Sequence, residues 1–433
     1  MQKNSPRGNS PLNLSIHTKY QKTVLPNGIR VVTETIPYVR SASCGVWINV
    51  GSRDEDESKN GISHFIEHMV FKGTRRYSNL QIARSLESVG GYLNAFTTKE
   101  HTCFYARILD IYLNKAIDVL SDLIQYPLFN PREIEKEKLV VLEELKNIQD
   151  DPDDIIHDYL DRNIYHKHSL ALPVIGQTET IKSITQDDMF DYMEGHFLPN
   201  RMVVAAAGNL VHDKFVETVN KFFTINRNNK KFSREKGPTI NFASHEIIDR
   251  PHSQAYICIG TLGYSIKSKM RYAVLVLNTL LGDGMSSRLF QNIREKYGIA
   301  YAVYSFANLL SDTGNFGVYI GTDNENINRS LDMIYKEFSL LKEKGVTRTE
   351  LERTKTQMKG SMMLGLENMS NRMMRLGSGE LYFEEYMTLD DVIRKIDRVS
   401  EENISEVTNK LLNRENFSTV IFRGMNGKNN KKG

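Results

Sequence analysis

The sequence predicts an α+β protein made of two homologous α/β-sandwich-like domains, each an antiparallel-rich sheet flanked by helices. Three observations lead to this prediction. The chain has 433 residues, more than one hydrophobic core normally supports. Short strand-like segments are mixed with longer helix-like ones. The order of these segments in the first half returns in the second half after a polar linker, which indicates two copies of one unit.

The first half contains strong local signals for strands and helices. Residues 22–37 alternate apolar and polar side chains around Pro26-Asn27-Gly28, which predicts a β-hairpin. Asn60 is placed to cap a helix over residues 61–72 that ends at Gly73. Ser78 and Gln81 form a capping-box signature. The other elements expected here are strands over 43–50, 92–98, 101–109 and 203–209, and helices over 79–89, 111–125 and 131–149.

A polar, basic segment with a Gly-Pro pair, residues 224–241, predicts the linker between the domains. Beyond it we expect a strand over 254–260, helices over 272–281 and 287–297, and then two strands, the second over 314–321. The predicted division is therefore a tail over 1–20, a first domain over 21–223, a linker over 224–242 and a second domain over 243–433.

Composition excludes several classes of protein. Lysine and arginine number 56 against 53 acids, a net charge of +3, which argues against nucleic acid as the main partner. The three cysteines are far apart, so neither a disulfide framework nor a thiolate metal site is indicated, and a reducing compartment fits best. No run is long enough for a membrane span, and the start lacks a secretory signal. We expect a bacterial cytoplasmic protein, with the mitochondrial matrix as the alternative because residues 1–20 contain no acid.

The pattern His64-Phe-Ile-Glu67-His68 carries the chemistry of the first domain. Two imidazoles four residues apart lie on the same face of a helix, about one turn from each other, and can reach one metal ion. Glu67 lies on the flank of that face, close to a water on the metal without having to bind the metal itself. The first domain is therefore predicted to bind a metal.

A catalytic zinc takes three protein ligands and leaves one position for water, so a third ligand is needed. The helix expected over 131–149 offers several carboxylates. Glu137 and Glu144 lie on one stripe of that helix, whereas Glu143 points about 100° away from Glu144, so Glu143 and Glu144 cannot both be ligands. The residues alone leave the third ligand open among the glutamates of this helix, which are Glu133, Glu135, Glu137, Glu143 and Glu144.

The alternative to a metal site is an amphipathic helix with surface or core histidines, and a lone His-x-x-x-His would favour that alternative. Chance would produce the full pattern with its glutamate in roughly two chains of this kind in a hundred. Since a glutamate-rich helix also follows downstream, we favour the metal site.

With these residues in place, the chain resembles the inverzincins, whose zinc motif is His-x-x-Glu-His. More narrowly it resembles the pitrilysin and insulin-degrading family, and within it the processing-peptidase branch. The matching segments are GISHFIEHMVFKGT at 61–74, GGYLNAFTT at 90–98, VVLEE at 140–144 and SRLFQNIREKYGIAY at 287–301. They extend across most of the chain.

For the motif residues, the resemblance implies specific roles. His64, His68 and Glu144 would bind one Zn²⁺ per chain, and Glu67 would be the general base that activates water. Glu137 would be a further acidic residue near the zinc that orients water or supports the ligands.

For the second domain, the resemblance implies that Arg294 and Tyr301 face the metal and stabilise the oxyanion of the reaction. In a homodimer this pair would come from the other protomer. Asn94, Ala95 and Phe96 would form the edge strand on which the substrate is laid as an added β-strand.

The function implied by the resemblance is that of a zinc-dependent endopeptidase, a metalloprotease that hydrolyses unfolded or extended peptides for processing or degradation. A homodimer is expected, or a heterodimer with a related subunit. The alternative is a non-catalytic or partner-dependent subunit of a processing-peptidase-like heterodimer, since the family includes members without chemistry. The substrate itself cannot be named from the sequence.

Overall fold

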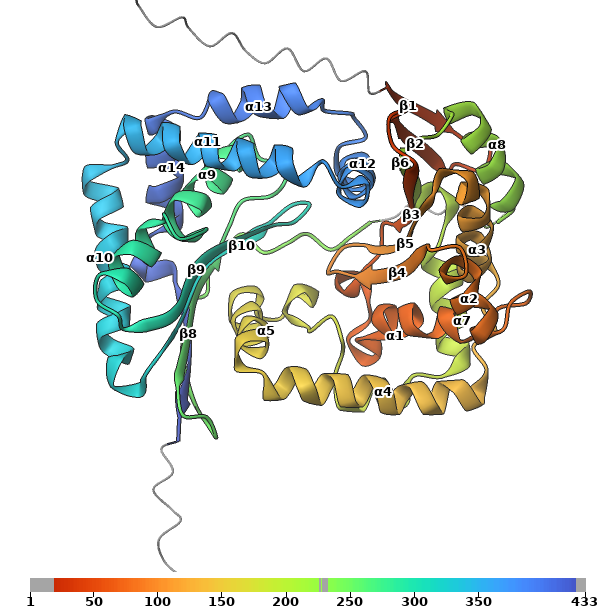
Figure 1. Ribbon diagram of the computed structural model, residues 1–433. Coiled ribbons are helices and arrows are strands. Elements are labelled where there is room, and N and C mark those ends of the chain that lie inside the picture. The colour runs from red at the N-terminus through yellow and green to blue at the C-terminus, as the bar shows by residue number, and fades with distance from the viewer. Residues whose placement is uncertain (1–18, 226, 228–232, 426–433) are drawn as a thin grey trace, which may run out of the picture.

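Two β-sheets organise the chain into two lobes (Figure 1). A computed structural model describes residues 19–225, 227 and 233–425. In spatial order the six-stranded first sheet contains β1 (Lys19–Val24), β2 (Arg30–Thr35), β6 (Met202–Gly208), β3 (Ser41–Ile48), β5 (Thr102–Leu109) and β4 (Tyr92–Thr97). The five-stranded second sheet contains β7 (His245–Arg250), β11 (Ser418–Gly424), β8 (Ala255–Leu262), β10 (Gly314–Thr322) and β9 (Ala300–Leu309).

The two sheets have the same topology, which confirms the predicted repeat. In the first sheet β2 and β6 are parallel, and β6, β3, β5 and β4 then pair antiparallel in that order. In the second sheet β7 and β11 are parallel, and β11, β8, β10 and β9 follow in the same antiparallel manner. Strand β1 is an addition to the first sheet, where it forms the predicted hairpin with β2. The repeat makes β4 and β9 equivalent edge strands.

Helices cover the faces of both sheets. In the first half of the chain they are α1 (Ile62–Met69), α2 (Asn79–Glu87), α3 (Leu113–Gln125), α4 (Pro131–Asp150), α5 (Pro152–Tyr165), α6 (Thr178–Ser183), α7 (Gln186–His196) and α8 (His212–Phe222). In the second half they are α9 (Arg271–Gly282), α10 (Ile327–Lys344), α11 (Arg348–Gly365), α12 (Met369–Phe383), α13 (Leu389–Asp397) and α14 (Glu401–Leu411). None of the helices in the described part of the chain has the length and apolar character of a membrane span.

Two helices are exchanged between the lobes. Helix α5 packs on β8 and β11 of the second sheet, where Leu160 and Ile164 contact Gly260. Helix α12 packs on β3 and β6 of the first sheet, where Met373 lies against Gly45. Figure 1 shows α5 beside the second sheet and α12 beside the first. Each lobe therefore completes its core with a helix from the other half of the chain.

A buried ion-pair network also joins the lobes. The guanidinium of Arg53 binds Glu100 at 2.6 Å and both carboxylate oxygens of Asp312 at 2.7 and 2.9 Å. The same Glu100 accepts a hydrogen bond from the backbone N–H of Ser311 at 2.8 Å. Ser311 and Asp312 form the tip of the β9–β10 hairpin, so this tip is fixed on the first lobe.

The structure departs from some local predictions. Helix α1 begins after Gly61, and Asn60 does not cap it, because Glu55 accepts from the N–H groups of Gly61 and Ser63 at the start of the helix. The helix expected over 287–297 is wound as a π-helix over Phe290–Glu295. Strand β7 was not predicted from the sequence. Strand β1 begins at Lys19, inside the predicted tail.

The described part of the predicted linker contains neither helix nor strand, while residues 226 and 228–232 lie outside the described residues, as do residues 1–18 of the predicted tail. The domain bounds stay a prediction, because α5 and α12 each pack across them.

Two glycines of α12 offer a matched test of the helix exchange. A Cβ at Gly377 would lie 2.0 Å from Nε1 of Trp47, whereas a Cβ at Gly379 would meet nothing within 4 Å. We expect Gly377→Ala to lower the free energy of unfolding by about 1–3 kcal/mol through overpacking. We expect Gly379→Ala to raise it by about 0.5–1 kcal/mol, as for other helix glycines. Urea unfolding followed by fluorescence of Trp47, the single tryptophan, measures both. Equal stabilities would contradict the tight contact between α12 and β3.

Candidate metal centre

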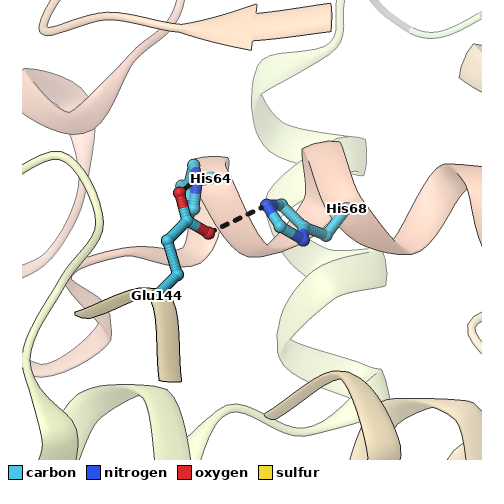
Figure 2. A group of neighbouring side chains, drawn as sticks. All are labelled: His64, His68 and Glu144. Carbon is cyan, nitrogen blue, oxygen red and sulfur yellow. Dashed lines mark ion pairs between the residues drawn. The ribbon is translucent and has the colours of Figure 1, made fainter. Parts of the chain in front are cut away.

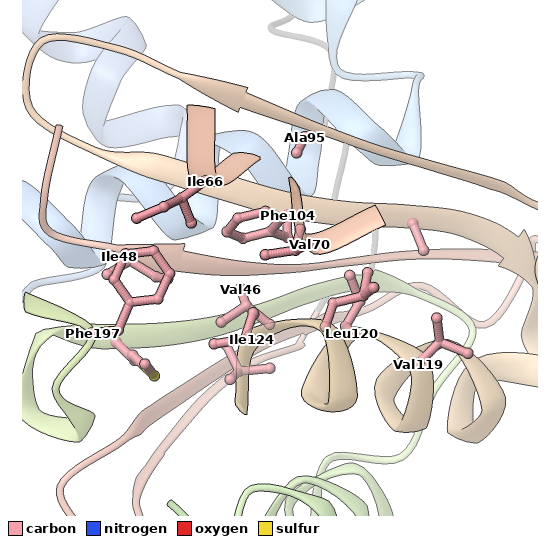
Figure 3. Close-up of a cluster of buried hydrophobic side chains, with 14 of the residues drawn as sticks. Val46, Ile48, Ile66, Val70, Ala95, Phe104, Val119, Leu120, Ile124 and Phe197 are labelled. Carbon is pink, nitrogen blue, oxygen red and sulfur yellow. The ribbon is translucent and has the colours of Figure 1, made fainter. Parts of the chain in front are cut away.

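Helix α1 is held in place by its apolar face. Phe65, Ile66 and Met69 are fully buried in the core between the first sheet and α3, which Figure 3 shows around Ile66 and Val70. Because the helix has only two turns, burial of this face fixes the direction of the opposite face. His64, Glu67 and His68 lie there and are only partly buried.

Helix α4 brings Glu144 to the two imidazoles. Glu144 Oε1 lies 3.8 Å from His64 Nε2, and Glu144 Oε2 lies 3.5 Å from His68 Nε2 (Figure 2). One ligand atom from each of the three residues lies within 4.8 Å of the others. Of the glutamates left open by the sequence, Glu133 and Glu135 pair with lysines of α4 and Glu143 is exposed. The structure thus brings Glu144 to the histidines.

These distances fit a metal ion. Ligand atoms held about 2.1 Å from a tetrahedral zinc lie about 3.4 Å from one another, close to the two separations found here. Both are too long for direct hydrogen bonds between imidazole and carboxylate. Two imidazoles with one carboxylate are also a donor set that catalytic zinc uses. The residues present therefore fit a zinc ion.

Glu137 supports His68 from the side away from Glu144. Its Oε1 lies 2.9 Å from His68 Nδ1, and its Oε2 lies 2.5 Å from Lys72 Nζ. A carboxylate on the second nitrogen of an imidazole fixes the ring and its tautomer, leaving Nε2 free for a metal. Glu137 therefore acts on His68, and nothing in its contacts places it on a reacting water. The sequence analysis did not identify Lys72, which forms an ion pair with Glu137.

Glu67 lies next to the histidines and is held by the edge strand. Its Oε2 accepts a hydrogen bond of 2.6 Å from Oγ1 of Thr97, which ends β4. Burial raises the pKa of the Glu67 carboxyl, and the negative charge of Glu144 adds to this, while Thr97 lowers it. A carboxylate with a raised pKa is a better proton acceptor. Thr97 was also missed, because a threonine at the end of a strand carries no signal in the sequence.

The two imidazoles have different proton affinities in the metal-free protein. Burial, together with the neighbouring His68, lowers the pKa of His64 to about 4. Burial lowers the pKa of His68 as well, but its hydrogen bond to Glu137 and the charge of Glu144 raise it above the ordinary value. The neutral imidazole at His64 is the form that binds a metal.

Strand β4, which carries Asn94, Ala95 and Phe96, is the edge strand of the first sheet next to α1. The backbone N–H of Ala95 donates to the Asn94 side-chain oxygen at 2.9 Å, and Asn94 Nδ2 donates to the hydroxyl of Tyr92. The ring of Phe96 packs edge-on against Trp47 at 5.7 Å. Among the described residues β4 is thus the last strand of its sheet and lies next to α1, and its role in binding a substrate stays a prediction.

Arg294 and Tyr301 lie in the second lobe. The guanidinium of Arg294 stacks 4.8 Å from the ring of Phe290 in the π-helical turn. Tyr301 is 39% exposed on β9, and burial together with Tyr256 raises its pKa. Within the described residues, no hydrogen bond or ion pair joins either residue to α1 or α4. The roles of Arg294 and Tyr301 at the metal centre therefore stay a prediction.

Comparison with known proteins identifies the family. The protein-family model described as "Insulinase (Peptidase family M16)" matches residues 30–178. A second family model, described as "Peptidase M16 inactive domain", matches residues 183–358. "Uncharacterized zinc protease YmxG" of Bacillus subtilis (strain 168) is 41% identical over 397 residues, covering 92% of this chain and 96% of that protein. This chain belongs to peptidase family M16. The resemblance to the insulin-degrading family is thereby confirmed, and its processing-peptidase branch stays a prediction.

Further similar proteins match over most of the chain. "Uncharacterized zinc protease SCO5738" of Streptomyces coelicolor is 40% identical over 93% of this chain and 89% of its own length. A protease from Helicobacter pylori has a TM-score of 0.88 at 22% identity, covering 94% of this chain and 99% of that one. A structure from Pseudomonas fluorescens, described as a "peptidase M16 inactive domain", also has a TM-score of 0.88, at 20% identity and 94% and 98% coverage. At these identities the two structures establish the fold alone, and they support the two-lobe α+β architecture.

Proposed function

We propose that this M16 chain is a zinc-dependent endopeptidase with one Zn²⁺ on His64, His68 and Glu144. The observation that carries the proposal is the meeting of these three side chains from two separate helices, with Glu67 beside them. The names of the relatives in Bacillus subtilis and Streptomyces coelicolor support zinc as the metal and proteolysis as the activity.

The charges around the centre favour a divalent cation. Glu67, Glu137 and Glu144 bring three carboxylates to two imidazoles, and Lys72 is the cation paired with one of them. Zinc bound here would polarise the scissile carbonyl and lower the pKa of the attacking water. Glu67 would accept a proton from that water and then deliver it to the leaving amine. The hydrogen bond from Thr97 keeps the Glu67 carboxylate at the end of β4 during these transfers.

The substrate class follows from the free edge of β4. An extended peptide can add to this edge through main-chain hydrogen bonds, which depend little on its side chains. The backbone N–H of Ala95, now bound by the Asn94 side chain, is one donor that the added peptide would use. We therefore propose unfolded or extended peptides as substrates, for processing or for degradation.

We further propose that the protein acts as a homodimer, with a related partner subunit as the alternative. Within the described residues no hydrogen bond or ion pair joins Arg294 or Tyr301 to α1 or α4, which leaves both side chains available to the centre of the other protomer. The buried free cysteines Cys44, Cys103 and Cys258 fit a reducing compartment, and we keep the cytoplasm as the proposed location.

The role of Glu67 is tested by Glu67→Gln. This variant should retain zinc, since Glu67 is not a ligand, and should cleave a fluorogenic peptide at least about a hundredfold more slowly, because the proton acceptor is lost. Zinc content is measured by mass spectrometry. Chelation should abolish wild-type cleavage, and added zinc should restore it. Near-wild-type cleavage by Glu67→Gln would show that another group moves the proton.

The dimer is tested by mixing two variants that fail for different reasons. Glu67→Gln and Arg294→Ala should each be nearly inactive alone. In mixed dimers one centre has both Glu67 and the partner's arginine, so an equal mixture should recover about a quarter of wild-type activity. A mixture that forms dimers without recovering activity would place Arg294 in its own chain's site. A wild-type chain that binds zinc but cleaves nothing would favour the partner-dependent alternative.

A further inference from the structure

The N-terminus of α1 is capped by a residue that lies outside the helix and outside the metal motif. The buried carboxylate of Glu55 accepts hydrogen bonds from the backbone N–H groups of Gly61 at 2.7 Å and Ser63 at 2.8 Å. It also accepts one from the side-chain amide of Asn60 at 3.0 Å. Within residues 19–225, 227 and 233–425, no lysine or arginine pairs with Glu55. The charge of the carboxylate is therefore balanced by N–H groups at the start of the helix.

The position of this cap bears directly on His64. Ser63, whose N–H binds Glu55, immediately precedes His64, and α1 is only eight residues long. Gly61 adopts φ of 95° and supplies no side-chain cap. A small rotation at the start of so short a helix would displace the His64 imidazole relative to Glu144. Glu55 thus restrains the turn that carries the first histidine.

The segment that ends in Glu55 is hydrogen-bonded to the turn that follows β4, the strand proposed to bind the substrate. Ser52 N–H donates to the carbonyl of Thr98 at 3.1 Å, and Arg53 N–H donates to the carbonyl of Lys99 at 2.8 Å. These carbonyls belong to the turn that follows Thr97, the residue that holds Glu67. Residues 51–55 therefore connect the end of β4 to the start of α1. This segment therefore fixes the edge strand and α1, which carries the two histidines, relative to each other.

Burying a charged carboxylate at this place lowers the stability of the folded protein. Burial raises the pKa of Glu55 to about 7, although the hydrogen bonds from Gly61 and Ser63 lower it. A cap of the ordinary kind, the Asn or Ser side chain of the N-cap residue, would accept from one N–H group without a buried charge. The Glu55 carboxylate instead accepts from both N–H groups at once, and these bonds are charge-assisted when the pH lies above its raised pKa.

We propose that Glu55 is a positioning residue of the metal centre, which sets the zinc affinity by fixing the first turn of α1. This inference rests on the proposed zinc site. Supporting residues of metal ligands typically change metal affinity 10- to 100-fold when they are altered. A role in stability alone would change the unfolding temperature and leave the zinc affinity of the folded protein unchanged.

The test compares Glu55→Gln with Ser78→Ala. Ser78 caps α2 in the same lobe, where its hydroxyl accepts from Gln81 N–H, and α2 carries no proposed ligand. Zinc affinity is measured on folded protein by competition with a chromophoric chelator. We expect Glu55→Gln to weaken zinc binding at least about tenfold. We expect Ser78→Ala to lower the unfolding temperature with unchanged zinc affinity.

Each outcome decides between the proposals. A folded Glu55→Gln variant with wild-type zinc affinity would overturn the positioning role while leaving the zinc site intact. Wild-type protein without zinc affinity would overturn the proposed function, and this inference with it. If Glu55→Gln does not fold, Asn60→Ala replaces it, because the Asn60 amide joins Glu55 to Pro173. Asn60→Ala should weaken zinc binding several-fold, and unchanged affinity in that variant would overturn the role.

Discussion

The approach of α4 to α1 is the constraint on which the metal centre depends. Two imidazoles on one short helix cannot complete a site by themselves, and the missing carboxylate comes from a helix far along the chain. Glu144 reaches both Nε2 atoms only because α1 and α4 are both packed on the core of the first lobe, where Val141 and Leu145 are buried on α4 and Phe65 on α1. Apolar burial thus fixes the positions of the two helices, and the polar residues that they carry form the proposed zinc site.

The exchange of α5 and α12 makes the two lobes one unit. Each helix covers a sheet of the other half of the chain, and Arg53 links the β9–β10 hairpin tip to the turn behind β4. That turn follows Thr97 and lies against the segment that ends in Glu55. Contacts between the lobes therefore reach both sides of the centre, the strand that holds Glu67 and the helix that holds His64. The second lobe therefore helps to hold the segments on either side of the proposed site.

Much of the fold could be predicted because its signals are local. Alternation around Gly28, the capping box at Ser78 and the proline at the start of α4 each mark an element within a few residues. The pairing of His64 with His68 is local for the same reason. The repeat in the chain was sufficient to predict two related sheets.

The rest depends on packing between distant segments. Glu144 could not be chosen among the glutamates of α4 from spacing alone, and its choice came from the family resemblance. Asn60 looked like a cap, but Glu55 takes that role because the segment before the helix folds back on it. The exchange of α5 and α12 between the lobes cannot be predicted from the sequence, because an apolar helix face does not reveal which sheet it covers. Thr97 and Lys72 act only through the residues that they hold.

The central claim is that a carboxylate from α4 completes a metal site begun by α1. The most direct measurement is zinc binding, by calorimetry, to two variants that remove neighbouring carboxylates of the same helix. Glu144→Gln should lose most of its zinc affinity, whereas Glu143→Gln, which changes an exposed side chain, should bind zinc like the wild type. Equal affinities in the two variants would contradict the account.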